Sequence, residues 1–322
     1  MIGQGGARTG IDLGATSVKL VRGTGDARLQ RITHYGLERL EREPAGEETQ
    51  VAAVKRLMDR LGLKRADLGR LAIAMSAEQA SVREVTLPEL TEAQLAGALR
   101  FEARKHLNLE QIADEEQGEP VVAFQMLGAV AEAAAGAREM RVLFAGVSRS
   151  RRQVLLEALL AGNLEPDVID LEALAGLNAL FACRVQGDAV LALLDLGAHH
   201  ASVHVSGRRG GFFSRSLTLA APSADEGREP YAERLRDLLR ETLTFYRGRF
   251  RRPIAGLYLS GGGAALAGLP EALRGQIDGP VEILDPLGEF AAGARTAADA
   301  AAHPARFAVA CGVCRWWDEP HV

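Results

Sequence analysis

The chain has 322 residues, of which 47% are hydrophobic and 25% are charged, and 38 Lys and Arg stand against 42 Asp and Glu for a net charge of −4. These values are typical of a folded chain of about two domains, and they exclude disorder and collagen. The mildly acidic balance argues against nucleic acid as a partner, because binding a phosphate backbone requires a concentrated excess of Lys and Arg.

The cysteines and the apolar segments indicate where the protein works. Three cysteines are too few for a disulfide framework, and an odd number suits a reducing compartment. The start of the chain lacks the basic and apolar regions of a signal peptide, and no run of about 18 uncharged apolar residues is found. We therefore expect a cytosolic protein.

An internal repeat is the first pattern along the chain. Residues 11–15 (IDLGA) recur as residues 194–198 (LDLGA), and an alternating stretch that predicts a second strand follows each copy, at 17–21 and 201–205. In each copy the aspartate comes where a buried strand meets a glycine turn. The repeat predicts two half-chains built on one plan.

The segment between the repeats predicts alternating strands and helices. Thr91 and Gln94 have the spacing of a capping box, which marks the start of a helix. The predicted elements, in chain order, are strands over 71–74 and 82–87, a helix over 91–107, a strand over 140–147, a helix over 151–161, and a strand that enters a helix over 168–181.

The second half predicts a long amphipathic helix and a glycine-rich turn. Apolar residues between 231 and 250 recur on one stripe, and a cluster of four arginines between 247 and 252 ends the helix. A strand over 254–259 leads into three glycines at 261–263, and a short helix begins near Pro270. Strands and helices that alternate without a long linker favour an α/β architecture of two packed domains.

The aspartate-and-glycine turns suit a phosphate–magnesium site. A carboxylate supplies a hard oxygen ligand for the ion, and a glycine turn leaves backbone N–H groups free to cradle phosphate. Thr16 and Ser17 could donate to phosphate, Lys19 could neutralise charge, and glycines 261–263 could let a nucleobase or ribose lie against backbone. A single Asp-x-Gly is usually only a turn, whereas a duplicated pair with a downstream triple glycine is far less expected by accident.

Several segments together resemble a known family, the type IV pilus assembly protein PilM family. That family has the fold of actin, Hsp70 and the sugar kinases and is closest to the division protein FtsA. The resemblance extends over about residues 10–317, and residues 87–103 are similar to a small inserted domain that PilM and FtsA share. The segments that carry it are 10–20 (GIDLGATSVKL), 170–172 (DLE) with Asn178, 194–198 (LDLGA), 245–247 (FYR) and 258–264 (YLSGGGA).

The resemblance implies an α/β chain with an actin-like, ribonuclease-H-like two-domain fold, a small inserted α+β domain and a shortened second half. Where the family normally carries a helical subdomain that closes one wall of the nucleotide cleft, this chain has only a polar stretch over 220–230. The implied domains are a first actin-like domain at 8–78 and 164–187, the inserted domain at 79–163, a second actin-like domain at 188–300, and a C-terminal helix at 301–322 that packs on the first domain.

The resemblance also implies a function. Such proteins work at the cytoplasmic face of the inner membrane as scaffolds of the pilus assembly platform, contact its other components, and hold the cytoplasmic tail of the membrane protein PilN beside the inserted domain. By that analogy the tail would contact Val82, Val85, Leu95, Leu99 and Phe101. ATP and Mg²⁺ would be held between the halves, with Asp12 and Asp195 facing the metal, by Asp12, Gly14, Thr16, Ser17, Lys19, Asp195, Gly197, Gly261, Gly262 and Gly263.

Two departures from the family leave alternatives open. The bulky His199 and His200 follow the second turn, where the family has small hydroxyl residues, and they weaken the case for ATP. The shortened second half is similar to relatives from the mannose-sensitive pilus system and to the cytoplasmic part of the secretion protein GspL, whose partner would be GspM-like. An active ATPase or small-molecule kinase is the competing class, and a protein that binds ATP only as a structural ligand is the third. The oligomeric state is left open.

Three other patterns are interpreted as structural. Cys311 and Cys314 lie in an apolar segment over 308–317 that is expected to be helical, and they are predicted to belong to the core. His200 and His204 would lie about 13 Å apart along a strand, too far to share a metal ion, and are predicted to be solvated. The arginine cluster is predicted to be a solvated helix end, with contact to anionic lipid as the alternative.

Overall fold

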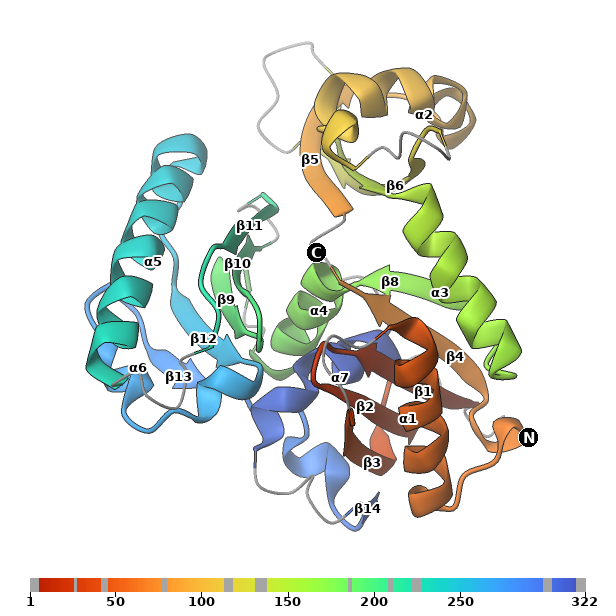
Figure 1. Cartoon of the computed structure of the whole chain (residues 1–322). Helices are drawn as coiled ribbons and strands as arrows, with labels where there is room; N and C mark the ends of the chain where they lie inside the picture. The colour runs from red at the N-terminus through yellow and green to blue at the C-terminus, as the bar shows by residue number, and fades with distance from the viewer. Residues whose placement is uncertain are drawn as a thin grey trace.

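Three β-sheets organise the chain into two lobes and a smaller third layer (Figure 1). The computed structural model describes residues 6–25, 28–41, 46–76, 80–112, 118–130, 138–184, 187–207, 211–221, 228–297 and 303–316. The strands are β1 (Ala7–Leu13), β2 (Ser17–Thr24), β3 (Arg31–Arg39), β4 (Arg70–Met75), β5 (Ala80–Pro88), β6 (Val121–Ala129), β7 (Glu139–Val147), β8 (Val168–Leu171), β9 (Leu191–Leu196), β10 (Ala201–Ser206), β11 (Phe213–Leu217), β12 (Gly256–Ser260), β13 (Val281–Ile283) and β14 (Arg295–Thr296). The α-helices are α1 (Glu47–Leu61), α2 (Glu92–His106), α3 (Arg149–Ala161), α4 (Glu172–Arg184), α5 (Arg228–Phe250), α6 (Leu269–Ala272) and α7 (Ala308–Cys314).

The first lobe is a six-stranded sheet in the order β14-β3-β2-β1-β4-β8. Strands β1 to β3 form an antiparallel meander, and β4 and β8 continue the sheet in parallel with β1. Helices α1 and α3 pack on one face of this sheet, and α4 and α7 pack on the other (Figure 1). Because β8 comes last in the strand order, it is an edge strand. It lies on the side of the sheet that adjoins the third layer.

Helix α7 approaches β1 and α4 closely because two glycines leave room for it. A Cβ atom at Gly10 would overlap the carbonyl oxygen of Ala310, and a Cβ atom at Gly312 would overlap the carbonyl oxygen of Ala175. Any larger residue at either position would push the helix away from its neighbours. The last helix of the chain is thus part of the core of the first lobe.

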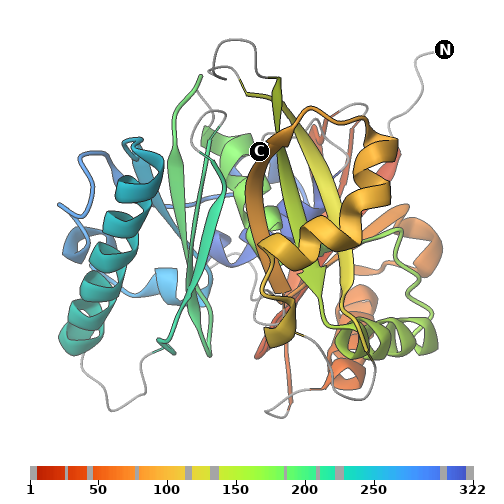
Figure 2. The same ribbon diagram turned by 90° about the horizontal axis from the view of Figure 1, so that it is seen from above.

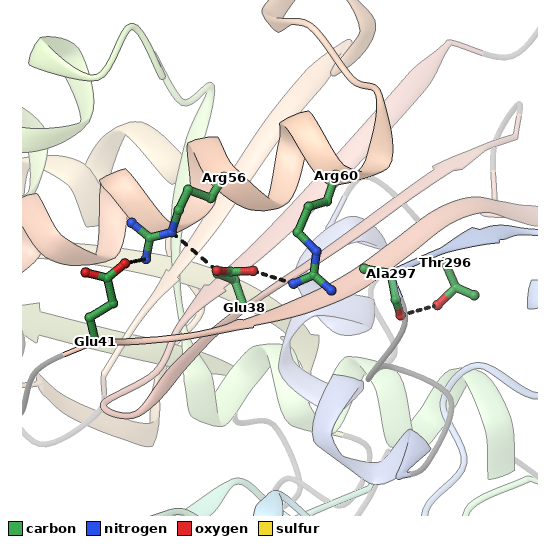
Figure 3. Close-up of polar contacts among 6 residues, drawn as sticks. All are labelled: Glu38, Glu41, Arg56, Arg60, Thr296 and Ala297. Carbon is green, nitrogen blue, oxygen red and sulfur yellow. Dashed lines mark hydrogen bonds and ion pairs between the residues drawn. The ribbon is translucent and has the colours of Figure 1, made fainter.

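Ion pairs join helix α1 to strand β3 (Figure 3). Glu38 on β3 pairs through Oε1 with Arg56 Nε at 3.3 Å and through Oε2 with Arg60 Nη1 at 2.5 Å. Arg56 also reaches Glu41 at 3.5 Å. Because both arginines are more than a third exposed, these pairs orient the helix more than they stabilise it.

The second lobe repeats the plan of the first. Its sheet has the order β11-β10-β9-β12-β13, with an antiparallel meander of β9 to β11 followed by the parallel strands β12 and β13. Asp12 lies opposite Lys19 in the first hairpin, and Asp195 lies opposite Ser202 in the second. The predicted repeat of two hairpins is therefore confirmed. Within the described residues no helix, not even α5 with 23 residues, combines the length and the apolar character needed to cross a bilayer.

The third layer is an antiparallel sheet in the order β5-β7-β6, with α2 lying across one face (Figure 2). The predicted capping box of α2 is confirmed: the Gln94 N–H donates to Thr91 Oγ1 at 3.3 Å, and the Thr91 N–H donates to Gln94 Oε1 at 2.9 Å. The core between helix and sheet holds Leu87, Leu95, Ala103, Leu107, Met140, Val142 and Phe144.

One partly buried carboxylate connects the third layer to the second lobe. Glu84 of β5 accepts a hydrogen bond from the Phe212 N–H at 2.6 Å through Oε2, and its Oε1 lies 3.6 Å from Arg141 Nε. Phe212 leads into β11, so this bond spans the gap between the two sheets. A charge-assisted hydrogen bond of this kind is stronger than a neutral one.

Two predicted elements of the second half differ from the structure. The strand expected over 254–259 begins at Gly256 and ends at Ser260. The helix expected near Pro270 is the single turn α6, because the chain then passes through Gly275, whose positive φ of 83° breaks helical geometry.

The two C-terminal cysteines are buried, as predicted. Cys311 and Cys314 both lie in α7 with no exposed surface. The predicted helix end at residue 317 lies outside the described residues. In the polar connection predicted over 220–230, residues 220 and 221 form no helix, 222–227 lie outside the described residues, and 228–230 already belong to α5.

The prediction that His204 is solvated is wrong. Its side chain is only 2% exposed, and its ring hydrogen-bonds through Nε2 to Ser202 Oγ and through Nδ1 to Ser214 Oγ, both at 2.9 Å. The period-two rule holds for Val203, which packs in the core of the second lobe, but the opposite face of β10 is covered as well, by α4. Because the lobe core covers one face of β10 and α4 covers the other, both its faces are buried.

Candidate functional site

A cavity of about 460 Å³ lies between the two lobes, where both hairpin turns meet the glycine turn after β12. We call it the interlobe cleft. Its size is within the range of small-molecule sites. Its wall contains all ten residues that the sequence analysis assigned to ATP and magnesium: Asp12, Gly14, Thr16, Ser17, Lys19, Asp195, Gly197, Gly261, Gly262 and Gly263.

At the first turn of the cleft a lysine ammonium group pairs with a carboxylate. Lys19 Nζ lies 3.0 Å from Asp12 Oδ2, and both side chains are largely buried. A Cβ atom at Gly14 would lie 2.7 Å from Lys19 Nζ and 2.9 Å from the Ser17 carbonyl oxygen, so only glycine fits the turn. Gln50 of α1 donates from Nε2 to the Gly14 carbonyl oxygen at 3.1 Å. The turn is thus fixed from both sides.

The second turn holds the other aspartate. Ser260 Oγ donates to Asp195 Oδ1 at 2.6 Å, and the Gly197 N–H donates to the His200 carbonyl oxygen at 3.0 Å. Burial raises the pKa of Asp195; the Ser260 hydrogen bond opposes this rise, and the nearby Asp12 carboxylate adds to it. Because the Asp12 carboxylate disfavours the charged form of Asp195, a divalent cation between them would be stabilised.

The glycine turn after β12 closes the third side of the cleft. Gly261 has a φ of 82°, and a Cβ atom there would lie 2.5 Å from the Leu196 carbonyl oxygen. Its N–H donates to the Ala305 carbonyl oxygen at 3.1 Å. The glycines therefore let the end of β12 lie directly against the end of β9, which leaves bare backbone facing the cleft.

Three charged residues of the cleft were not assigned to it from the sequence. They are Arg39, Glu172 and Arg306, and the last lies on a one-turn helix, η6 (Pro304–Phe307). Arg306 Nε is buried without a hydrogen-bond partner among the described residues, and burial, followed by the charge of Arg39, lowers its pKa. No local motif marks Arg306, because only the packing of η6 on the glycine turn brings it to the cleft.

The charged groups of the cleft suit a ligand that carries phosphate groups. Lys19, Arg39 and Arg306 provide positive charge, and His199 and His200 also lie in the wall, at the position where the sequence predicts crowding. Among the residues that the structure describes, no group of three or more His, Cys, Asp or Glu could hold a metal ion. A magnesium ion here would therefore take phosphate oxygens and water to complete its shell, which is its usual habit in nucleotide sites.

The five residues predicted to contact a peptide do not form one surface. Val85, Leu95 and Leu99 pack in the core between α2 and the three-stranded sheet, and Leu95 is completely buried. Val82 lies on the opposite face of β5, against the core of the first lobe and the apolar cluster between the lobes. Phe101 lies on the outer face of α2 and is 70% exposed. Strand alternation and the helical period thus send these side chains in three directions.

A second cavity, of about 280 Å³, lies between the third layer and the first lobe. We call it the sheet cavity. It adjoins the face of the three-stranded sheet that α2 leaves uncovered, and both β6 and β8, which contribute to it, are edge strands. All but three of its lining residues are apolar: Met75, Val121, Ala123, Phe124, Gln125, Leu143, Ala145, Val147, Arg152, Ile169, Asp170, Leu171 and Leu174.

Solved structures share this architecture. The chain is similar to one from a PilM–PilN type IV pilus biogenesis complex, with 22% identity, coverage of 97% of this chain and 99% of that chain, and a TM-score of 0.74. Weaker similarity is found to the ethanolamine utilization protein EutJ from Carboxydothermus hydrogenoformans (13% identity, 96% and 89% coverage, TM-score 0.48). A protein with an actin-like ATPase fold from Bacteroides thetaiotaomicron is similar at 14% identity, with 87% and 91% coverage and a TM-score of 0.45.

The sequence itself matches one family. No curated protein matches the chain. The family model described as type IV pilus assembly protein PilM matches residues 10–220, which is more than half of the chain. The predicted two-lobed α/β fold with an inserted third layer is confirmed by the architecture and by the similarity to the structure from the PilM–PilN complex. The chain therefore belongs to the type IV pilus assembly protein PilM family.

Proposed function

We propose that this protein is a scaffold of a type IV pilus assembly platform, located at the cytoplasmic face of the inner membrane, and that it binds the cytoplasmic tail of a PilN-like membrane protein. The family membership supports the pathway, and a solved complex of PilM with PilN supports the kind of partner. The observation that carries the proposal is the apolar sheet cavity beside the third layer.

The walls of the sheet cavity suit an extended apolar peptide. Ten of its thirteen lining residues are apolar, and they come from β4, β6, β7, β8 and α4. An edge strand offers unpaired backbone groups, so a peptide beside β6 or β8 can add main-chain hydrogen bonds to its apolar contacts. In this proposal the tail lies in the sheet cavity and not on the outer face of α2.

Tail binding is tested with a synthetic peptide of the cytoplasmic tail of the PilN-type protein from the same organism, titrated calorimetrically. Ala123 is exposed on β6 and lines the sheet cavity, so Ala123→Trp should fill the cavity without disturbing the core and weaken binding at least tenfold. Phe101→Ala, on the outer face of α2, should leave the affinity unchanged. The reverse pattern, in variants shown to be folded by circular dichroism, would move the tail site to the outer face of α2.

Nucleotide is the second ligand in this proposal. Asp12 and Asp195 would face a magnesium shell, Lys19 would neutralise phosphate charge, and the backbone at 261–263 would accept the adenosine. The buried, unpartnered Nε of Arg306 and the glycine-only turns support a ligand in the interlobe cleft. The proposed role is that of a bound ligand that sets the angle between the lobes without turnover.

Titration of the protein with Mg-ATP tests whether the interlobe cleft binds nucleotide. Saturable binding is expected for the wild type, with at least a tenfold loss in Asp12→Asn, because the variant loses the carboxylate next to the proposed metal position. Glu157→Gln, on the outer surface of α3, is the matched control and should bind like the wild type. Binding that is absent from the wild type would reject the nucleotide. Steady phosphate release that requires Asp12 would favour the alternative class, an active ATPase or small-molecule kinase.

A further inference from the structure

Asp170 is a buried carboxylate that the fold leaves half satisfied. It lies on the edge strand β8, opposite Ala74 of β4, and its side chain is 8% exposed. Its Oδ1 accepts a hydrogen bond from the Leu171 N–H at 2.8 Å. Its Oδ2 is buried and has no hydrogen-bond partner among the described residues.

An unsatisfied carboxylate oxygen is costly in a protein interior. Buried polar atoms are almost always paired, and each exception calls for an explanation such as an absent ligand. The burial of Asp170 raises its pKa to about 6, against the opposing effect of the Leu171 N–H. The carboxylate is therefore mostly ionised at neutral pH even though nothing in the described structure neutralises it.

Asp170 lines the sheet cavity, and this location gives the missing partner a place to bind. The elements packed around it contribute apolar residues, with two polar exceptions: Gln125 of β6 and Arg152 of α3. Arg152 is the only other titratable or charged group among the lining residues. Asp170 is thus the one strong acceptor in a mostly apolar wall.

We infer that Asp170 selects the occupant of the sheet cavity by accepting a hydrogen bond at Oδ2 from an uncharged N–H donor, a backbone or side-chain amide, carried by an apolar peptide segment. This inference rests on the proposed function. An anion is disfavoured because Asp170 would repel it. A Lys or Arg on the peptide is disfavoured because it would be desolvated in an apolar wall that already contains Arg152. An amide has a smaller desolvation penalty and still satisfies the oxygen.

The pairing links tail binding to pH. A hydrogen bond donated to the ionised carboxylate favours that form, so binding lowers the pKa of Asp170 and releases a proton. Affinity should therefore be highest above pH 6 and should fall as the pH drops through 6 towards 5.

The test uses the same synthetic tail peptide, with its ionisable groups blocked, titrated between pH 5 and pH 8. The wild type should bind several-fold more weakly at pH 5 than at pH 7. Asp170→Asn should bind about tenfold more weakly at pH 7, the loss expected for one charge-assisted hydrogen bond, and its affinity should not vary with pH. A merely structural role would instead lower the Tm of Asp170→Asn, whereas we expect the Tm to be retained or raised because a buried charge is removed.

A scan of N-methylated and alanine-substituted peptides identifies the donor. One amide should reproduce the tenfold loss with the wild type and cause no further loss with Asp170→Asn, because the remaining carbonyl oxygen keeps the Leu171 N–H and an NH2 group, which cannot accept, replaces Oδ2. Loss that maps to a Lys or Arg of the peptide would overturn the uncharged donor. Equal affinities and pH profiles for wild type and Asp170→Asn would overturn the role of Asp170 while the proposed function stands. A wild type that does not bind the tail would overturn both.

Discussion

At the scale of single residues, burial shifts the pKa values of His204 and Asp170 in opposite directions. The effects of these two shifts on folding stability can be separated by experiment. His204, inside the second sheet, has its pKa lowered to about 4, mainly by burial and then by the charge of His200. Asp170 has its pKa raised to about 6, also mainly by burial. Between pH 4 and pH 6.5 the folded state thus binds fewer protons than the unfolded chain at His204, and more at Asp170.

The lowered pKa of His204 predicts how folding stability depends on pH. The unfolded chain gains a proton at this histidine as the pH falls below about 6.5, whereas the folded state stays neutral until about 4, so folding stability is lost over this window. We expect the difference in unfolding free energy between wild type and His204→Gln to fall by about 2 kcal/mol from pH 7 to pH 5. Urea unfolding of both proteins at four pH values measures it. The contribution of Asp170 is common to both and cancels, and a constant difference would contradict the prediction.

The cleft shows which single residues can be found from a sequence. Asp12 and Asp195 were predictable because each belongs to a local strand-and-turn pattern that occurs twice. Arg306 and Asp170 were not predicted as site residues, because their unpartnered atoms result from packing between distant segments. His204 was misplaced since its own strand alternates correctly, while the covering of the second face depends on α4.

At the level of elements, local sequence patterns predicted where helices lie. They were less successful in predicting which surface of a helix packs in the core and which faces solvent or a partner. The capping residues Thr91 and Gln94 lie where the sequence places them. Phe101 was expected beside Leu95 and Leu99 in one peptide-binding surface, but it follows Leu99 by two residues, about 200° around the helix, so its side chain lies on the solvent side. The period of a helix defines its buried stripe, whereas the surface that receives a ligand depends on the tertiary neighbours.

The cap of α2 can be tested separately from the sheet cavity. Thr91→Ala removes the acceptor for the Gln94 N–H, and loss of such a cap costs about 1 kcal/mol. We expect urea unfolding to show this decrease and Thr91→Ser to recover most of it. Tail affinity should be unchanged in Thr91→Ala, because α2 covers the face of the sheet opposite the sheet cavity. A variant that loses tail binding with no loss of stability would contradict this separation.

At the level of the whole molecule, the two lobes were predictable and the third layer's position was not. The repeated hairpins indicated two halves, and the two sheets share one topology. The hydrogen bond from the Phe212 N–H to Glu84 links residues that are 128 positions apart, so no local sequence pattern predicts it. The domain boundaries expected from the family resemblance stay predictions, although three separate sheets are consistent with them.

The place of α7 has a consequence for the order of events during synthesis. Residues 308–314 form the last described helix to leave the ribosome, and they pack beside β1 at Gly10 and against α4 at Gly312. Ala308 and Val309 also belong to the wall of the interlobe cleft. A nascent chain that has not yet reached α7 therefore leaves the part of this sheet face beside Gly10 uncovered, and it has no finished cleft before then. Only a chain whose synthesis has passed α7 can therefore bind a ligand in the interlobe cleft.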